Sequence, residues 1–553
     1  MQNRNHIIFT HWNRVALFSI LTFIGSVAVA QRDTTKKQVV DITSSFKPVL
    51  RNVSKLNISS AQLQVDTSKL TMQYAIPAQN LYYSYIPVPL RPLAYQPDTI
   101  LNLGDRNYVK FGFGNYTTPL VSVRAGFGDG KKSLINLYGD YISSKGKIQY
   151  QDYSLLDLKA TGSYFTQSHE VYGKVGLNLS EFYQYGYDKI NYSFDKLDVQ
   201  QHFQHVQIGV GARNTAKNDL GIFYNPSVTV NLFGFKDRAA ETSIAIELPA
   251  EKQITEKIHA KISVLGDFTS YNTKNFLPND VKVKNNILLI SPEVKYTDTR
   301  FFVTTGVTPV IDNGKVAVLP NIWGEIKLKE NAFIFQAGLV GKVTKNTLQR
   351  LASFNPYLYT IDQQNNTREV ELYGGIKSTL GKHFNFSAKV GLVHFKNLQL
   401  AENDTIDYRG FYIKNEPDAN NVRVHGDISY VNKDKFSFTA GVTFNGYTDI
   451  LINKYAFGLI PAEINAAVRW QAMKQLFLKS ELWLFGGSPY QLKNNEVKNT
   501  FGGTDLDVGA EYKINPKWSA WMDINNLFSN KYQRWTNYPV YGINVLVGAK
   551  YSF

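Results

Sequence analysis

The 553-residue sequence contains no cysteine, and after its N-terminal segment it has no apolar run near the about 20 residues that a membrane-spanning helix needs. The missing cysteines exclude a disulfide scaffold and a cysteine-ligated metal centre. Charged residues make up only 19% of the chain and apolar residues 43%, a balance that excludes a disordered protein and a charged coiled coil. Aromatic residues are abundant instead, with 34 Tyr and 34 Phe. This composition is compatible with a β-barrel membrane protein, because half of the residues of a barrel face water.

The N-terminus carries the features of an export signal. Arg4 and Arg14 precede an uncharged apolar run that ends Ala-Val-Ala at Ala30, and small residues at these positions are what a signal peptidase reads. We therefore expect residues 1–30 to be a signal peptide that is cleaved between Ala30 and Gln31. The alternative is a membrane anchor, but the run is short for a span and polar residues follow it at once.

Residues 31–105 differ from the rest of the chain in their proline tract. Its prolines are Pro77, Pro87, Pro89, Pro92 and Pro97. Proline fixes φ and lacks a backbone N–H, so the tract favours an extended conformation and cannot supply a regular strand ladder. We expect a periplasmic or lumenal N-terminal extension here rather than a folded core.

From residue 106 to residue 553 the sequence alternates apolar and polar residues with a period of two. In the segment 435–446, for example, the apolar residues are Phe436, Phe438, Ala440, Val442 and Phe444. Successive side chains of a strand point to opposite faces, so one face of such a strand is apolar and the other is polar. The pattern predicts an all-β domain over 106–553, which a soluble sandwich or a transmembrane barrel would satisfy.

The lengths of the connections distinguish these two architectures. Near the C-terminus, the predicted short turns fall at 381–383, 432–434, 473–474 and 515–516. The long polar loops alternate with them and fall at 397–420, 447–460, 487–501 and 530–540. Short turns at one end and long loops at the other are typical of a transmembrane barrel, with the turns in the periplasm and the loops outside. We therefore predict a transmembrane antiparallel β-barrel of about 22 strands, the number associated with plugged outer-membrane transporters.

Aromatic residues near the predicted strand ends suit the interfacial girdles of such a barrel, where an amphipathic ring lies at the level of the lipid headgroups. They are Trp470, Trp483, Trp518, Tyr532, Trp535 and Tyr538. For each of them, a place in a loop or in the lumen is the alternative.

The C-terminus resembles the last strand of outer-membrane barrels. Apolar residues alternate with polar or small ones from Ile543 to the end of the chain, with Tyr551 and Phe553 on the apolar face. In that class the closing aromatic residue is read by the barrel-assembly machinery, so the resemblance implies that Tyr551 and Phe553 form an assembly signal.

A second motif lies just upstream. The triplet Asn526-Leu527-Phe528, followed by Tyr532, resembles the penultimate-strand signature of TonB-dependent receptors. With the strand count, it identifies residues 106–553 as similar to the barrel of such a receptor, and the Tyr- and Asn-rich, Cys-free composition is similar to barrels of the Bacteroidota. The sequence departs from the family in two respects. Residues 31–105 are too short for the full plug domain that precedes the barrel in these receptors, and neither 41–50 nor its neighbours match the short energy-coupling box that precedes the plug.

Motifs that carry chemistry are scarce. No glycine-rich phosphate loop, no His-Glu-x-x-His and no Gly-x-Ser-x-Gly occurs, so we expect no enzyme activity and no cofactor. His202 and His205 fall on opposite faces of a strand, which disfavours a shared metal. Asp505, Asp507 and Glu511 share the polar face of one strand and are expected to be lumen charges, either balanced by counter-ions or part of a cation or solute path.

Two functions fit this pattern best. The first is an outer-membrane transport barrel whose lumen is occluded by the N-terminal extension, by inward-folded loops or by a partner. The second is a non-transporting accessory or scaffold barrel of an envelope or secretion complex, and an exported β-sandwich adhesin is a third. The expected partners are outer-membrane lipid and lipopolysaccharide, the barrel-assembly machinery, and a periplasmic or lipoprotein partner. The formal net charge of +15 suits the phosphates of lipopolysaccharide. Nucleic acid is not an expected partner.

Overall fold

The computed structural model describes residues 107–553 except 217, 275–278, 329–332, 381–382 and 433–434. These residues all belong to one compact unit, Val49–Phe553. The predicted signal peptide, its cleavage between Ala30 and Gln31, and the extension 31–105 lie outside the described residues. In the part of the chain that is described, no helix is long and apolar enough to cross a membrane.

The described residues form 25 strands and the short helix α2 (Leu348–Phe354). In chain order the strands are β1 (Tyr108–Gly114), β2 (Thr118–Gly128), β3 (Ser133–Ser144), β4 (Tyr153–Phe165), β5 (His169–Tyr183), β6 (Gln200–Asn214), β7 (Ile222–Tyr224), β8 (Ser227–Phe235), β9 (Ala239–Gln253), β10 (Ile258–Thr273), β11 (Lys282–Thr297), β12 (Phe301–Asp312), β13 (Lys315–Leu328), β14 (Phe333–Thr344), β15 (Thr367–Leu380), β16 (Phe384–Asn403), β17 (Phe411–Asn432), β18 (Phe436–Thr448), β19 (Ala462–Gln471), β20 (Leu476–Phe485), β21 (Pro489–Gln491), β22 (Val497–Asn499), β23 (Gly503–Lys513), β24 (Trp518–Asn525) and β25 (Asn544–Ser552).

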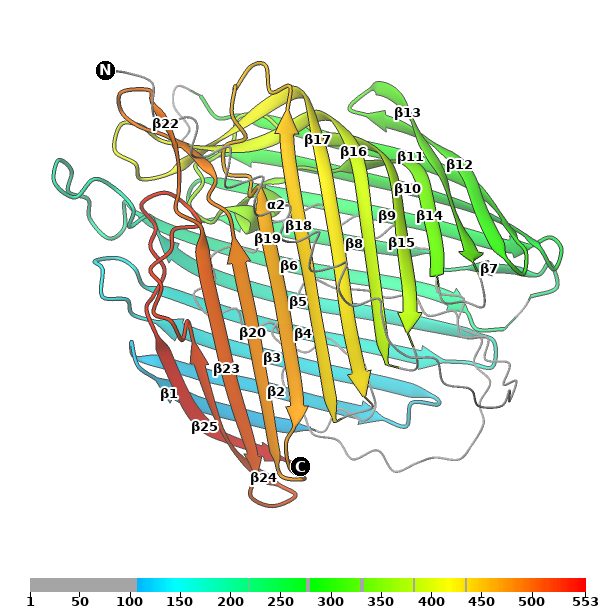
Figure 1. The fold of residues 1–553 in the computed structure, drawn as a ribbon, viewed down its shortest axis with the longest axis horizontal. Helices are drawn as coiled ribbons and strands as arrows, with labels where there is room; N and C mark the ends of the chain where they lie inside the picture. Colours follow the sequence, from blue (N-terminus) through cyan, green and yellow to red (C-terminus); the bar gives the residue numbers. More distant parts are fainter. Residues whose placement is uncertain (1–106, 217, 275–278, 329–332, 381–382, 433–434) are drawn as a thin grey trace, which may run out of the picture. The chain divides into compact units, whose positions relative to one another are not determined.

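One antiparallel sheet closes on itself to form the barrel (Figure 1). Each wall strand pairs with the next wall strand along the chain, and β25 pairs with β1 from Tyr108↔Ser552 to Gly114↔Leu546. The strands β7 and β8 both pair with β9 and occupy one position, so the 23-stranded sheet makes a barrel of 22 strands. The predicted fold class is confirmed, and two stacked sheets, as in a sandwich adhesin, are excluded for this part of the chain.

The outer face of the barrel is apolar, as the period-two pattern predicted. Leu392, Val547 and Phe335, from three different strands, are 58%, 52% and 48% exposed. The inner face carries paired charges instead, such as Lys389 and Glu371, whose Nζ and Oε1 atoms lie 2.9 Å apart. A closed ladder leaves no wall strand with an unpaired edge, which is the condition for crossing hydrocarbon. The described chain is therefore an outer-membrane β-barrel.

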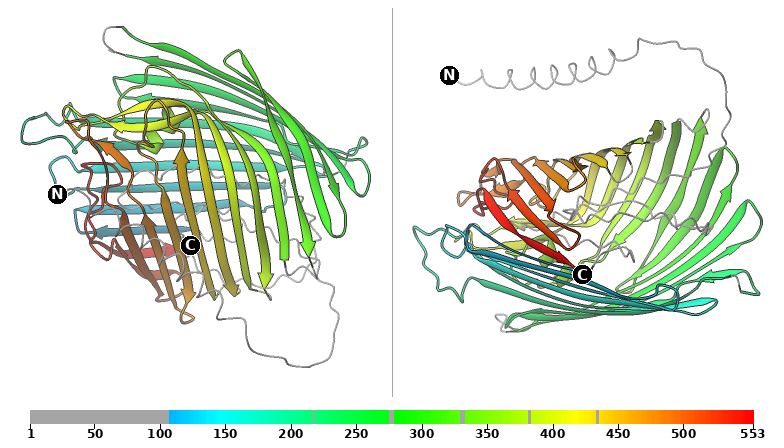
Figure 2. Two further views of the ribbon diagram at one scale, coloured as in Figure 1. Left: turned by 45° about the horizontal axis from the view of Figure 1, so that its top comes forward. Right: turned by 90° about the horizontal axis from the view of Figure 1, so that it is seen from below.

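The connections alternate between the two ends of the barrel, and at one end most of them are long. The short connections at the other end include 166–168, 298–300, 472–475 and 514–517. The long ones include 184–199, 345–366, 449–461, 486–502 and 526–543. Three connections at the long-loop end, 115–117, 236–238 and 313–314, are nevertheless short. Figure 2 shows the same arrangement from two further directions.

The predicted loop 397–420 is wrong in extent. Pairing between β16 and β17 stops at Lys396↔Asp418, resumes at Leu398↔Glu416 and continues to Asn403↔Phe411, which leaves only 404–410 as a connection. Pro417 lacks an N–H for the ladder, and Asn397 has a φ of 57°, so the two strands tolerate one irregular position and then continue. The polar sequence of this hairpin reflects its place beyond the apolar band, not an absence of strands.

The girdle prediction is correct for two aromatic residues and wrong for the others. Trp470 and Trp518 lie on the outer face and are 49% and 41% exposed. Trp483 points inward and donates its Nε1–H to Glu463 over 2.8 Å. The remaining three, Tyr532, Trp535 and Tyr538, are buried. They belong to the connection 526–543, which folds into the mouth of the barrel, so their rings pack against other loops and not against lipid headgroups.

Candidate functional site

The connection 345–366, here called the inner loop, folds into the barrel and carries α2. Thr347 begins the helix, and its side-chain oxygen accepts a hydrogen bond from the backbone N–H of Arg350 over 3.2 Å. Leu348 and Leu351, on one face of the helix, are buried. The sequence analysis predicts no helix in this region. A threonine before apolar residues at helical spacing is the signal that predicts it.

Glu241 of β9 fastens the start of α2 to the barrel wall. Its carboxylate accepts hydrogen bonds from the backbone N–H groups of Leu348, over 2.6 Å, and Gln349, over 3.1 Å. The Gln364 side chain donates a third bond to it over 2.7 Å. The first N–H groups of a helix have no partner within the helix and favour negative charge nearby, so a buried carboxylate is suited to this place.

Further contacts tie the inner loop to the neighbouring strands. The Tyr271 hydroxyl of β10 donates to the carbonyl of Ile361 over 2.7 Å. The Asn366 amide, at the end of the loop, donates to Asn285 of β11 over 2.6 Å and to Asp312 of β12 over 2.7 Å. The inner loop is thus held along four adjacent strands, and buried polar groups satisfy one another there.

The connection 526–543 covers the inner loop with aromatic rings. The Tyr538 ring stacks on Tyr357, with centroids 3.8 Å apart and planes at 22°. The Trp535 ring meets Phe354 and Phe411 edge-on, each at 5.2 Å. Tyr357, Tyr538 and Trp535 are all at most 4% exposed. We call this aromatic layer, with the inner loop beneath it, the cap.

A third connection, 184–199, completes the cap. The Tyr185 hydroxyl donates to the carbonyl of Pro539 over 2.9 Å. Beside it, a Cβ atom at Gly186 would lie 2.4 Å from the ring of Tyr538, so only glycine permits this approach. Burial raises the pKa of the Tyr185, Tyr357 and Tyr538 hydroxyls above the usual value, and these phenols stay neutral in the closed cap.

The predicted receptor-like motif and the predicted lumen charges meet in one arrangement. Asn526, with a φ of 47°, donates its backbone N–H to Asp507 over 2.8 Å and its side-chain amide to the carbonyl of Tyr541 over 2.7 Å. The Tyr532 hydroxyl donates to Asp505 over 2.7 Å. Both aspartates thus hold the loop that supplies the outer layer of the cap. Burial, and then the Asp505 carboxylate, raise the pKa of Tyr532 well above its usual value.

The other predicted site residues lie apart from the cap. Leu527 and Phe528 are 36% and 60% exposed. Glu511 points into the lumen near the closing seam, where its Oε1 lies 3.3 Å from the Nζ of Lys550. Tyr551 points outward and its ring lies 4.9 Å from that of Trp518, while Phe553 follows β25 and is 58% exposed.

His202 and His205 lie on opposite faces of β6, as their spacing predicted. His205 points into the lumen, where its Nε2 lies 3.1 Å from Oδ1 of Asn231, and His202 lies on the other face of β6. Within the described ranges, no group of three or more His, Cys, Asp or Glu residues is placed to hold a metal ion.

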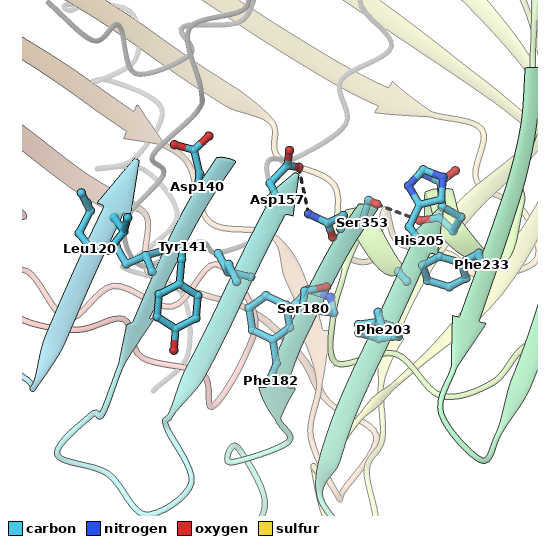
Figure 3. A pocket seen from close by; sticks show the side chains of 17 residues that line it. Leu120, Asp140, Tyr141, Asp157, Ser180, Phe182, Phe203, His205, Phe233 and Ser353 are labelled. Atoms are coloured by element: carbon cyan, nitrogen blue, oxygen red, sulfur yellow. Dashed lines mark hydrogen bonds between the residues drawn. The ribbon is translucent and has the colours of Figure 1, made fainter. Parts of the chain in front are cut away.

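A pocket of about 100 Å³ lies between α2 and the inner wall (Figure 3). Its wall side is built by β2 to β6 and β8, and its helix side includes Ala352 and Ser353. Several wall residues are apolar, among them Leu155 and Phe203. An apolar lining is unusual on the inner face of a membrane barrel, which is normally polar, so this pocket is a distinct feature of the lumen.

Comparison with known proteins gives a match in structure only. No protein family matches the sequence, and no curated protein does. FpvAI, solved in complex with pyocin S2, has a TM-score of 0.62 and 10% identity, over 81% of this chain and 73% of that one. The FrpB iron transporter from Neisseria meningitidis has a TM-score of 0.61 and 13% identity, over 81% and 82%. The copper transporter OprC has a TM-score of 0.60 and 12% identity, over 83% of each chain. At these identities the likeness shows the fold, which is that of the TonB-dependent receptor barrels.

Proposed function

We propose that this protein is an outer-membrane transport barrel, related in architecture to TonB-dependent receptors, whose external mouth is closed by its own cap. The observation that carries the proposal is the fastening of α2 inside the barrel by Glu241. A lumen enclosed by 22 strands is wide enough to need occlusion. The inner loop and the aromatic layer fill the external end of the lumen with buried side chains. Below them the inner wall is charged, which suits the passage of a polar solute.

Removal of the inner loop tests this proposal. Residues 346–366 would be replaced by a short Gly-Ser turn, and the conductance of the purified barrel would be measured in planar bilayers. We expect a large, steady conductance that the unaltered protein lacks, because the cap loses its inner layer. Replacement of the turn 472–475 by Gly-Ser is the control, since that turn lies at the opposite end of the barrel from the cap. An unchanged conductance after removal of the inner loop would contradict the closure.

We also propose that residues 1–30 are removed as a signal peptide and that residues 31–105 form a periplasmic or lumenal extension that adds to the occlusion. Membranes from cells that produce a variant without 31–105 would test this, with antibiotic sensitivity as the measurement. Increased sensitivity supports occlusion. Loss of a co-purified partner with unchanged sensitivity supports the scaffold role instead.

The scaffold role is the second candidate because apolar residues are exposed on the external connections. Ile190, Phe501 and Leu451 are 94%, 92% and 75% exposed, and they lie on three different loops beyond the lipid-facing wall. These three loops belong to the same end of the barrel, where a partner protein could cover their apolar side chains. Affinity isolation from native membranes in mild detergent would identify a lipoprotein, periplasmic or secretion partner, and isolation of the barrel alone would count against this role.

A further inference from the structure

The pocket beneath α2 is built from two neighbouring cross-strand rows of different chemistry. One row is polar and runs Asp140↔Asp157↔Asn178↔His205 across β3 to β6. The next row is displaced by two residues toward the external end. It is mainly apolar and contains Leu120, Ile142, Leu155, Ser180 and Phe203. Two residues along a strand span about 7 Å, so the carboxylates and the apolar side chains line opposite ends of one small space.

The negative charges of the two carboxylates in the polar row, Asp140 and Asp157, are balanced to different degrees by neighbouring side chains. Asp140 accepts two hydrogen bonds from Nη2 of Arg124, at 2.8 and 3.1 Å, which balances its charge. Asp157 accepts one bond from the neutral amide of Asn178 at 3.2 Å. Among the described residues, no lysine or arginine forms an ion pair with Asp157. Like charges directly opposite on neighbouring strands are destabilising, so this pair leaves one negative charge that a bound cation would offset.

The side chains of the row share one direction. Figure 3 shows Asp140, Asp157 and His205 extending to the same side of neighbouring strands, with Phe203 and Phe233 beside them. Ser353 and Ala352 of α2 close the opposite side of the pocket. The cavity of about 100 Å³ is several times the space that one water molecule occupies, about 10–15 Å³. It therefore has room for a small apolar group.

We propose that this pocket binds a small organic cation, with its ammonium group at Asp157 and its apolar body against Leu155 and Phe203 beneath α2. The ammonium donates to the Asp157 carboxylate, and the apolar body fills the space that water would otherwise occupy among apolar side chains. An anion is disfavoured because Asp140, Asp157 and Arg124 together carry a formal charge of −1. The site adds to the proposed transport role without depending on it.

Calorimetric titration of the purified, folded barrel in detergent tests this site with three matched probes. They are phenethylamine, the neutral 2-phenylethanol and the anionic phenylacetate. We expect phenethylamine to bind at least about tenfold more tightly than the other two, the usual effect of one charge-assisted hydrogen bond. Equal affinity for all three probes, or no binding of phenethylamine, would overturn the proposal.

Two variants locate the binding. Asp157→Asn removes the charge at nearly constant shape. It is expected to weaken the binding of phenethylamine by about tenfold and to leave the affinity for 2-phenylethanol unchanged. Ala352→Phe fills the pocket from the helix side and is expected to abolish binding. Glu325→Gln is the matched control, because that lumen carboxylate pairs with Lys377 on the distant strands β13 and β15. Unchanged affinity in Asp157→Asn, with the folded barrel verified by heat-modifiable migration, would refute the site. Conductance after removal of the inner loop is a separate measurement, so either proposal can fail alone.

Discussion

At the scale of single residues, the cap depends on a few polar side chains that the wall presents to the loops. Glu241 is 4% exposed and accepts three hydrogen bonds from the inner loop, two of them from the backbone of α2. Nothing in the local sequence distinguishes it from other acidic residues on inward-facing strand positions, such as Glu247. A sequence pattern predicts which face a side chain takes, but not which loop it will meet.

The substitution Glu241→Ala measures this fastening. It leaves two N–H groups of α2 and the Gln364 amide without their acceptor, so we expect the closed cap to lose about 1–3 kcal/mol. The measurement is limited proteolysis of the external loops, with the rate of cleavage reporting the fraction of open cap. Glu247→Gln, on the same strand and with an exposed side chain, is the control. Equal cleavage rates in both variants would show that the inner loop is held by its other contacts alone.

At the scale of elements, the strands were predictable and the loops were not. The segment 435–446 and the C-terminal strand have one apolar face each, and lipid on one side with water on the other imposes that pattern directly. The connection 526–543 has no such constraint. Trp535 and Tyr538 suit a girdle and a buried layer equally well, and only the inward fold of the loop decides between them. Asp505 and Asp507 contact Tyr532 and Asn526, which come from a loop whose path the sequence does not fix.

Ionisation of the buried tyrosines is expected to open the cap at high pH. Burial raises the pKa of Tyr357, Tyr532 and Tyr538 well above the usual value, whereas in an open cap these phenols ionise near pH 10. The open state then releases more protons, so the stability of the closed cap is fully present below about pH 10 and falls as the pH rises further.

The test follows conductance and near-ultraviolet tyrosinate absorbance together as the pH is raised. We expect both to increase over the same interval. In the double variant Tyr532→Phe, Tyr538→Phe, the rise in conductance is expected to be shallower, because two of the ionising groups are gone. Conductance that stays constant while all tyrosines ionise would contradict the coupling between the cap and these phenols.

At the scale of the whole molecule, the barrel depends on one seam that joins the two ends of the described chain. The strands β1 and β25 pair over seven positions, fewer than the fifteen that join β10 to β11. The backbone N–H of Phe553 donates to the carbonyl of Asn107 over 3.0 Å, which extends the seam to the last residue. Lys550 and Glu511 pair on its inner side, and the apolar residues of β25 face outward. Both ends must therefore be in register before the sheet can close.

The exposed ring of Phe553 provides a test of how that closure is reached. Phe553→Ser removes an apolar ring that is 58% exposed, so the finished barrel loses few contacts. If the C-terminal aromatic is an assembly signal, as the resemblance implies, the variant is expected to accumulate much less folded protein in the outer membrane, although its thermal stability once folded is unchanged. Heat-modifiable gel migration of membrane fractions measures the folded amount, and melting of the purified barrel measures stability. Phe528→Ser is the matched control, because that ring is 60% exposed on a loop. Equal folded amounts for the two variants would show that Phe553 acts as an ordinary lipid-facing residue, whereas a lowered melting temperature would assign it to the seam itself.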